Sequence, residues 1–153
     1  QWGSRRIGPD LARVGGKYSH TWHFRHMVNP REISAASNMP PFAHLAGESL
    51  DFGDTAAKMR ALRTVGVPYT AEQIQRSEQS AHAQAQEIAD FLANEAGTRL
   101  CEGDQLDDGC DLVVDSRMTA VIAYLQRLGR IPEGGMYDAP TTNPVAANTG
   151  ATP

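Results

Sequence analysis

The stretch DSRMTAVIAYLQRLGR, residues 115–130, carries the clearest helical pattern in the sequence. Asp115 or Ser116 can cap the N-terminus of a helix here, and Gly129 can end it. Apolar residues recur between these limits at the spacing of one helix face: Met118, Val121, Ile122, Leu125 and Leu128. This spacing predicts a terminal helix with one buried side.

Two shorter helices are predicted in the first half of the chain. Ser19 can cap a helix over residues 20–29, which Pro30 stops. Another helix is expected to begin after Asp54, and Gly66 can end it. The buried positions predicted for this second helix are Ala57, Met59, Leu62 and Val65.

A longer helix is predicted from Thr70 to about residue 95, because Thr70 and Gln73 form a capping box. Its apolar stripe is thin and rich in alanine, so we expect it at the surface of the core and not at its centre: Ala81, Ala85, Ile88 and Leu92. Residues 97–114 are expected to form an acidic loop. No useful stretch alternates with a period of two, so the chain is predicted to be mainly helical.

The bulk composition fits a single globular domain. The chain has 153 residues, of which 41% are hydrophobic and 21% charged. Its net charge of -4 gives no reason to expect a nucleic acid as partner. No apolar run approaches the ~20 residues that a membrane-spanning helix needs. Because the chain opens on Gln1, we expect it to be a piece of a longer protein whose anchor is not included. Residues 131–153 are rich in Pro, Gly, Thr, Asn and Ala, which predicts disorder.

The two cysteines, Cys101 and Cys110, lie within one Asp- and Gly-rich stretch. Free thiols are one interpretation, and a disulfide is favoured if the compartment is oxidising. Zinc is disfavoured, because no second Cys/His pair stands nearby at ligand spacing.

Three histidines, His20, His23 and His26, stand three residues apart on one predicted helix. Neighbouring members share a helix face, so a transition-metal site is one hypothesis. The alternative is a set of partly exposed histidines on a surface helix.

The motif SNMPPF, residues 37–42, places Met39 in a polar loop directly before Pro40 and Pro41. One interpretation is a methionine that packs into the core from a loop. The other is a thioether ligand, since sulfur is a soft donor that favours reduced haem iron, with the two prolines fixing the backbone that presents it. Spacing alone does not decide between them.

Several longer strings resemble one known family. WGSRRIGPDLARVGGKYS (2–19), TWHFRHMVNPRE (21–32), SNMPPF (37–42) and KMRALRTVGVPYT (58–70) closely resemble the mono-haem subunit of cbb3-type cytochrome c oxidases, the FixO/CcoO family. The resemblance covers most of residues 1–83 and again about 115–130. It implies an all-α, cytochrome c-like helical domain over residues 1–130. That domain would be incomplete, because the N-terminal haem-attachment helix with its C-x-x-C-H motif is missing. Residues 84–114 look like an insertion.

The resemblance also implies roles for particular residues. Met39 matches the distal axial ligand of the haem iron. Pro9 matches the proline whose carbonyl accepts a hydrogen bond from the proximal histidine, and Trp22 matches a tryptophan that lines the haem. Arg5 and Arg6 are predicted, on chemical grounds, as counter-charges for the haem propionates.

The function implied is that of an electron-transfer subunit of a proton-pumping oxidase in aerobic respiration. It would carry haem c and relay electrons towards the oxygen-reducing subunit. Its expected partners are the catalytic and di-haem subunits, on the periplasmic side of the bacterial inner membrane. It would touch the membrane only through the missing N-terminal anchor. The alternative is a haem-free interaction or assembly module that keeps the cytochrome scaffold.

Overall fold

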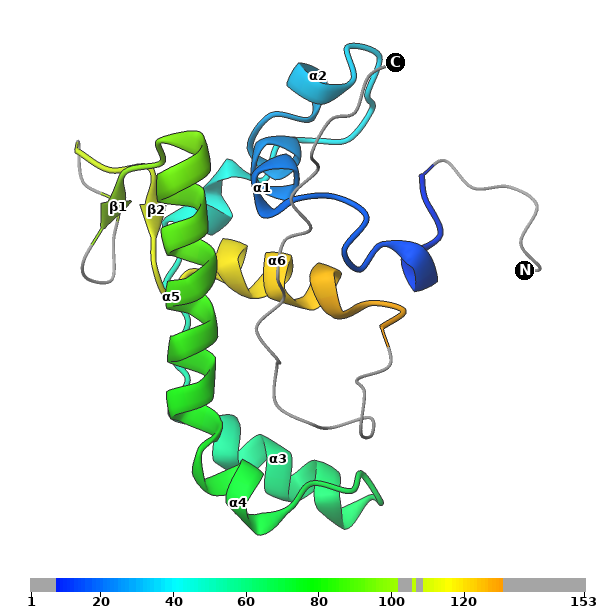
Figure 1. The fold of residues 1–153 in the computed structure, drawn as a ribbon, viewed down its shortest axis with the longest axis vertical. Helices are drawn as coiled ribbons and strands as arrows, with labels where there is room; N and C mark the ends of the chain where they lie inside the picture. The colour runs from blue at the N-terminus through cyan, green and yellow to red at the C-terminus, as the bar shows by residue number, and fades with distance from the viewer. Residues whose placement is uncertain (1–7, 102–105, 107–108, 131–153) are drawn as a thin grey trace, which may run out of the picture.

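The computed structural model describes residues 8–101, 106 and 109–130, and the predicted disordered tail lies outside these residues. The described part of the chain is mainly helical, which confirms the all-α class (Figure 1). The elements in chain order are η1 (Leu11–Arg13), α1 (His20–Val28), α2 (Pro30–Ile33), η2 (Ala43–Ala46), α3 (Thr55–Thr64), α4 (Ala71–Gln75), α5 (Ser77–Ala96), β1 (Leu100–Cys101), β2 (Leu112–Val113) and α6 (Arg117–Arg127).

Side-chain caps begin three of the helices where the sequence predicted them. The Ser19 hydroxyl accepts a hydrogen bond from the Trp22 N–H of α1 at 3.1 Å. The Ser116 hydroxyl accepts one from the third residue of α6 at 3.3 Å. Thr70 and Gln73 form the reciprocal capping box of α4. Each bond satisfies a backbone donor that the helix itself leaves free.

Three helices, α1, α5 and α6, pack against one another and enclose the core. In Figure 1, α6 begins beside the middle of the long helix α5 and runs sideways from it, and α1 lies above α6. The fully buried members of the core come mainly from α5 and α6: Ile88, Ala89, Leu92, Met118 and Ile122, together with Leu112 and Ala46. The predicted terminal helix is therefore confirmed, and Met118 and Ile122 mark its buried side.

The expectation for the alanine-rich stripe was wrong, because α5 lies at the centre of the core. Ala89 and Leu92 have no exposed surface, and Ala85 and Ile88 are also buried. Small alanine side chains let a second helix approach the backbone closely, so a thin stripe is compatible with full burial. The helix predicted from Thr70 is in addition two helices, α4 and α5, which meet at Arg76.

The prediction of a buried face on α3 was also wrong. No residue of α3 is buried, and Leu62 and Val65 are 44% and 77% exposed. Asp54 precedes the helix but makes no side-chain capping bond. The helix contacts α4 and α5 and lies at the end of the molecule furthest from α2 (Figure 1). A periodic apolar pattern predicted the helix correctly without predicting what the helix packs against.

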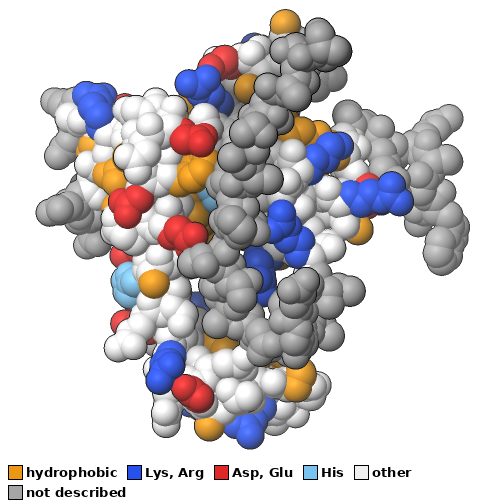
Figure 2. Space-filling view, in the orientation of Figure 1, with side chains coloured by type: hydrophobic (Ala, Val, Ile, Leu, Met, Phe, Trp, Pro, Cys, Tyr) orange, Lys and Arg blue, Asp and Glu red, His pale blue; other side chains and the backbone are white. Residues whose placement is uncertain are grey.

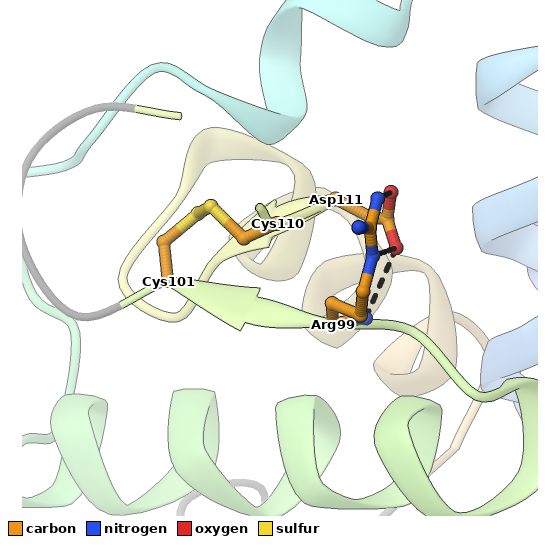
Figure 3. The surroundings of a disulfide bond; sticks show 4 residues. All are labelled: Arg99, Cys101, Cys110 and Asp111. Atoms are coloured by element: carbon orange, nitrogen blue, oxygen red, sulfur yellow. Dashed lines mark hydrogen bonds and ion pairs between the residues drawn. A yellow bond between two sulfur atoms is a disulfide. The ribbon is translucent and has the colours of Figure 1, made fainter. Parts of the chain in front are cut away.

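The acidic segment after α5 contains two short strands that the sequence did not predict. β1 and β2 pair in parallel, with Leu100 opposite Leu112 and Cys101 opposite Val113. A disulfide joins Cys101 to Cys110, so the open question about these thiols is settled in the structure (Figure 3). Residues 84–114 thus supply most of α5 and both strands; that they are an insertion stays a prediction.

An ion pair accompanies the disulfide. Arg99, just before β1, donates from Nη2 to Oδ1 of Asp111 at 2.9 Å and from Nε to Oδ2 at 3.1 Å (Figure 3). These bonds lower the pKa of the Asp111 carboxyl to about 2. Because both side chains are largely exposed, the pair fixes the register of the two strands more than it adds stability.

Residues 12–18 are attached to the end of α6, and we call this attachment the α6 clasp. The Gly15 N–H donates to the Leu128 carbonyl at 2.9 Å, and the Gly16 N–H donates to Oε1 of Gln126 at 2.9 Å. Nε2 of Gln126 donates in turn to the Tyr18 carbonyl at 2.8 Å. Gly129 has a φ of 75°, and a side chain there would collide with the backbone of residue 12.

The central position of α5 can be tested with two leucines. Leu92→Ala should lower the free energy of unfolding by about 2–5 kcal/mol, because it leaves a cavity in a fully buried site. Leu62→Ala on exposed α3 should cost less than about 1 kcal/mol. Chemical denaturation of the two variants measures the difference, and equal losses would contradict the core described here.

The disulfide can be tested by removing it. The double variant Cys101→Ala/Cys110→Ala should lose about 2.5 kcal/mol of unfolding free energy, since the unfolded chain gains the entropy of an open loop. Reductant should destabilise the natural chain by a similar amount and leave the double variant unchanged. If reductant leaves the free energy of unfolding of the natural chain unchanged, the disulfide is refuted.

Candidate functional site

Met39 lies in the loop between α2 and η2, and this loop is fixed to α1. The Phe42 N–H donates to the Met27 carbonyl in the last turn of α1 at 2.7 Å. The Met39 N–H donates to the Ser37 hydroxyl at 3.2 Å, which turns the chain tightly just before the two prolines. The Met39 side chain is half-buried. The loop therefore presents its methionine from a position anchored to α1.

Trp22 lies on α1 in a stack of three planar side chains. Its ring centroid is 4.0 Å from that of Tyr18, with an angle of 14° between the planes. On its other side His26 stacks at 4.6 Å and 13°. Trp22 is half-buried, and the two stacked partners hold its ring in one orientation.

His23 is the buried member of the three histidines, with 3% of its surface exposed. Its ring stands edge-on to those of Tyr18 and Trp22. Its Nε2 is buried without a hydrogen-bond partner among the described residues, and the same holds for Nδ1 of His26. Burial, helped by His20 and His26, lowers the pKa of His23 to about 4, so the ring is neutral near pH 7. A buried polar atom without a hydrogen-bond partner destabilises the folded chain, and a bound group that forms a hydrogen bond with it could remove this penalty.

The sequence did not show which of the three histidines is buried, and so did not distinguish His23 from the other two. The spacing of the histidines showed which residues share a helix, but burial depends on the contacts of α1 with α5 and α6. The Tyr18 and Trp22 side chains beside it were the only local signal.

The three-histidine metal site, one of the hypotheses from the sequence, was wrong. In the part of the chain that the structure describes, no three His, Cys, Asp or Glu side chains gather closely enough to hold a metal ion. His20 and His26 are six residues apart, so on a helix they point in directions about 120° apart. His20 packs edge-on against Phe91 of α5, and His26 stacks on Trp22.

The other predicted site residues are not brought together with Met39 and Trp22 in the part of the chain that the structure describes. Pro9 is exposed and lies just before η1, while Arg5 and Arg6 lie outside the described residues. The molecule has clefts of about 570, 420 and 240 Å³, and the second of these is lined in part by Phe24 and Val28 of α1 and Ala46 of η2, but Met39, Trp22 and Pro9 line none of the three. The structure thus brings the loop of Met39 to the helix of Trp22, and the joint site with Pro9 stays a prediction.

Comparison with protein families decides the relationship of this chain. The family described as "Cytochrome C oxidase, mono-heme subunit/FixO" matches residues 1–131. The chain belongs to this family. The resemblance noted in the sequence is thereby confirmed, and the helical architecture agrees with a cytochrome c-like domain of the FixO family. A search among curated proteins gave no match.

Membership of the FixO family implies a single haem, and the described residues fit one in three respects. Met39 offers a soft sulfur donor from an anchored loop. Trp22 is held rigidly between Tyr18 and His26, so the group that it could offer to a haem is its indole N–H, a donor suited to a propionate. Buried His23 keeps a ring nitrogen free without introducing a charge.

Among the described helices, none is both long and apolar enough to cross a bilayer. The longest, α5, carries a polar or charged residue at many of its positions.

The neutral state of His23 predicts a pH dependence of stability. Its pKa is about 4 in the folded chain and about 6.5 when unfolded, so the unfolded state binds the proton more readily. Stability should therefore fall as the pH drops from about 6.5 to 4, by up to about 3 kcal/mol from this residue. Denaturation of the natural chain and His23→Leu at several pH values isolates that contribution. A difference between the two that stays constant from pH 7 to 4 would rule it out.

Proposed function

We propose that this chain is the haem-bearing electron-transfer domain of a cbb3-type cytochrome c oxidase, with Met39 as an axial ligand of haem c. The observation that carries the proposal is the position of Met39 in a loop that a backbone hydrogen bond fixes to α1. Family membership supports a haem-ligand role for Met39, since the family is that of a mono-haem subunit.

Haem c, when bound, supplies a one-electron couple, and the residues of this chain set its surroundings. The Met39 thioether favours the reduced state of iron and so raises the reduction potential. Pro40 and Pro41 restrict the backbone beside it, which lowers the entropic cost of holding the sulfur in place.

Residues of α1 are proposed to contribute to the same haem site. Trp22 is held between Tyr18 and His26, and its indole N–H is able to donate to a propionate. His23 is uncharged and can donate from Nε2 without adding a buried charge. Pro9 is proposed to orient the proximal histidine through its carbonyl, and Arg5 and Arg6 to balance the propionates.

The partners follow from the proposed role. Electrons would arrive from a donor cytochrome on the periplasmic side of the inner membrane and pass to the catalytic subunit, beside the di-haem subunit. Oxygen chemistry and proton pumping belong to the complex and not to this chain.

Met39→Ala tests the proposal in the full-length protein. The natural protein should show the absorption bands of c-type haem. Met39→Ala should remove the features of methionine ligation and lower the midpoint potential by on the order of 0.1 V, within the ~0.8 V span that axial ligands set. Visible spectra and a redox titration measure both effects.

Met59→Ala, a half-buried methionine on α3, is the matched control and should leave the spectrum unchanged. A full-length protein without any haem would favour the haem-free assembly module instead. A haem spectrum indifferent to Met39→Ala would show that another residue ligates the iron.

A further inference from the structure

Helix α3 presents most of its surface to solvent although it carries large apolar side chains. Within this helix only Thr55, Ala56 and Met59 are half-buried, and the other residues are exposed. Leu62 and Val65 are both exposed, Val65 to 77%. Leu62 and Val65, which follows one residue after the end of the helix, are three residues apart and together expose a small apolar surface.

The charges of α3 are all of one sign. Lys58, Arg60 and Arg63 are exposed, and the helix contains no Asp or Glu. None of the carboxylates in the described residues pairs with them, although the chain as a whole has a net charge of -4. Figure 2 shows basic and apolar side chains at the end of the molecule that α3 and α4 form, together with an acidic group, and on α4 Glu72 is paired with Arg76.

These apolar and basic residues share one side of the helix. Lys58, Leu62 and Val65 are spaced by four and three residues, so they form a single stripe, and Arg63 flanks it. We call these four residues the α3 patch. Depletion of acidic groups around a small apolar centre with arginine beside it is typical of a protein interface.

We propose that the α3 patch docks against a surface of another oxidase subunit that combines apolar residues with carboxylates. The inference rests on membership of the oxidase family, which implies neighbouring subunits, and not on the haem site. Carboxylates on the partner would meet Lys58 and Arg63, and its apolar groups would cover Leu62 and Val65.

Two other occupants fit the patch less well. Anionic lipid is recognised by clusters of about four to eight basic residues, and α3 has three and lacks the aromatic anchors of interfacial helices. A second copy of the chain, related by a twofold axis, would place the same basic face against itself, which like charges oppose.

Matched double variants test the proposal in the full-length subunit, co-expressed with the other subunits of its oxidase in membranes. Arg63→Glu/Val65→Ser changes the patch. Arg31→Glu/Ile33→Ser makes the same kinds of change on α2, at the opposite end of the molecule, where both residues are also exposed (Figure 1). The patch variant should be retained in the solubilised complex at least tenfold less well during salt washing, and the α2 variant should match the natural protein. Equal retention of both variants would overturn the proposal.

Cross-linking gives a second measurement that does not depend on weakened variants. A photo-cross-linking residue in place of Val65 should form adducts with an identified oxidase subunit, at a segment that contains Asp or Glu. Adducts to lipid alone, to a second copy, or to no molecule would each refute the inference. The haem spectrum of the same preparation is recorded separately, so a failed haem site and a failed docking surface are distinguishable.

Discussion

The mutual packing of α1, α5 and α6 is the constraint on which the rest of the structure depends. Leu92 from α5 and Met118 and Ile122 from α6 are completely buried where these helices meet. This contact fixes α1, and with it the loop of Met39 that is bonded to the end of that helix. The same contact leaves the first part of α5 beyond the core, where α3 and α4 lie against it (Figure 1).

Local signals in the sequence were sufficient to predict most helices. Ser19, Ser116 and the Thr70–Gln73 pair act within three residues of the helix start, so their chemistry is readable without knowledge of the fold. The surroundings of a helix are not local. From periodicity alone we predicted a buried face on α3 and placed the apolar stripe of α5 at the surface of the core. The tertiary contacts show the reverse, with α3 exposed and α5 at the centre of the core. The parallel pairing of β1 with β2 depends on a disulfide and an ion pair across residues 99–111, which no run of residues announces.

The candidate site was predicted unevenly for similar reasons. Met39 was identified because a methionine between polar residues and two prolines is unusual in itself, and the family resemblance then gave it a role. The three histidines illustrate the opposite case. Their regular spacing suggested a shared metal, whereas His20 packs against Phe91, His26 stacks on Trp22, and of the three only His23 is buried. Burial and unpartnered nitrogens arise from tertiary contacts and could be found only in the structure.

The α6 clasp has a consequence for biosynthesis. Gly16 and Gln126, which it joins, are 110 positions apart in the chain. During translation the first of these residues leaves the ribosome long before its acceptor exists. Residues 12–18 therefore cannot form the hydrogen bonds of the α6 clasp until almost the whole domain has emerged from the ribosome. The attachment of residues 12–18 to α6 is therefore a late, non-local step. The entropic cost of closing this long loop arises after the helices have formed. A nascent chain stalled before α6 would thus have residues 12–18 next to α1 but without their hydrogen bonds to Gln126 and Leu128.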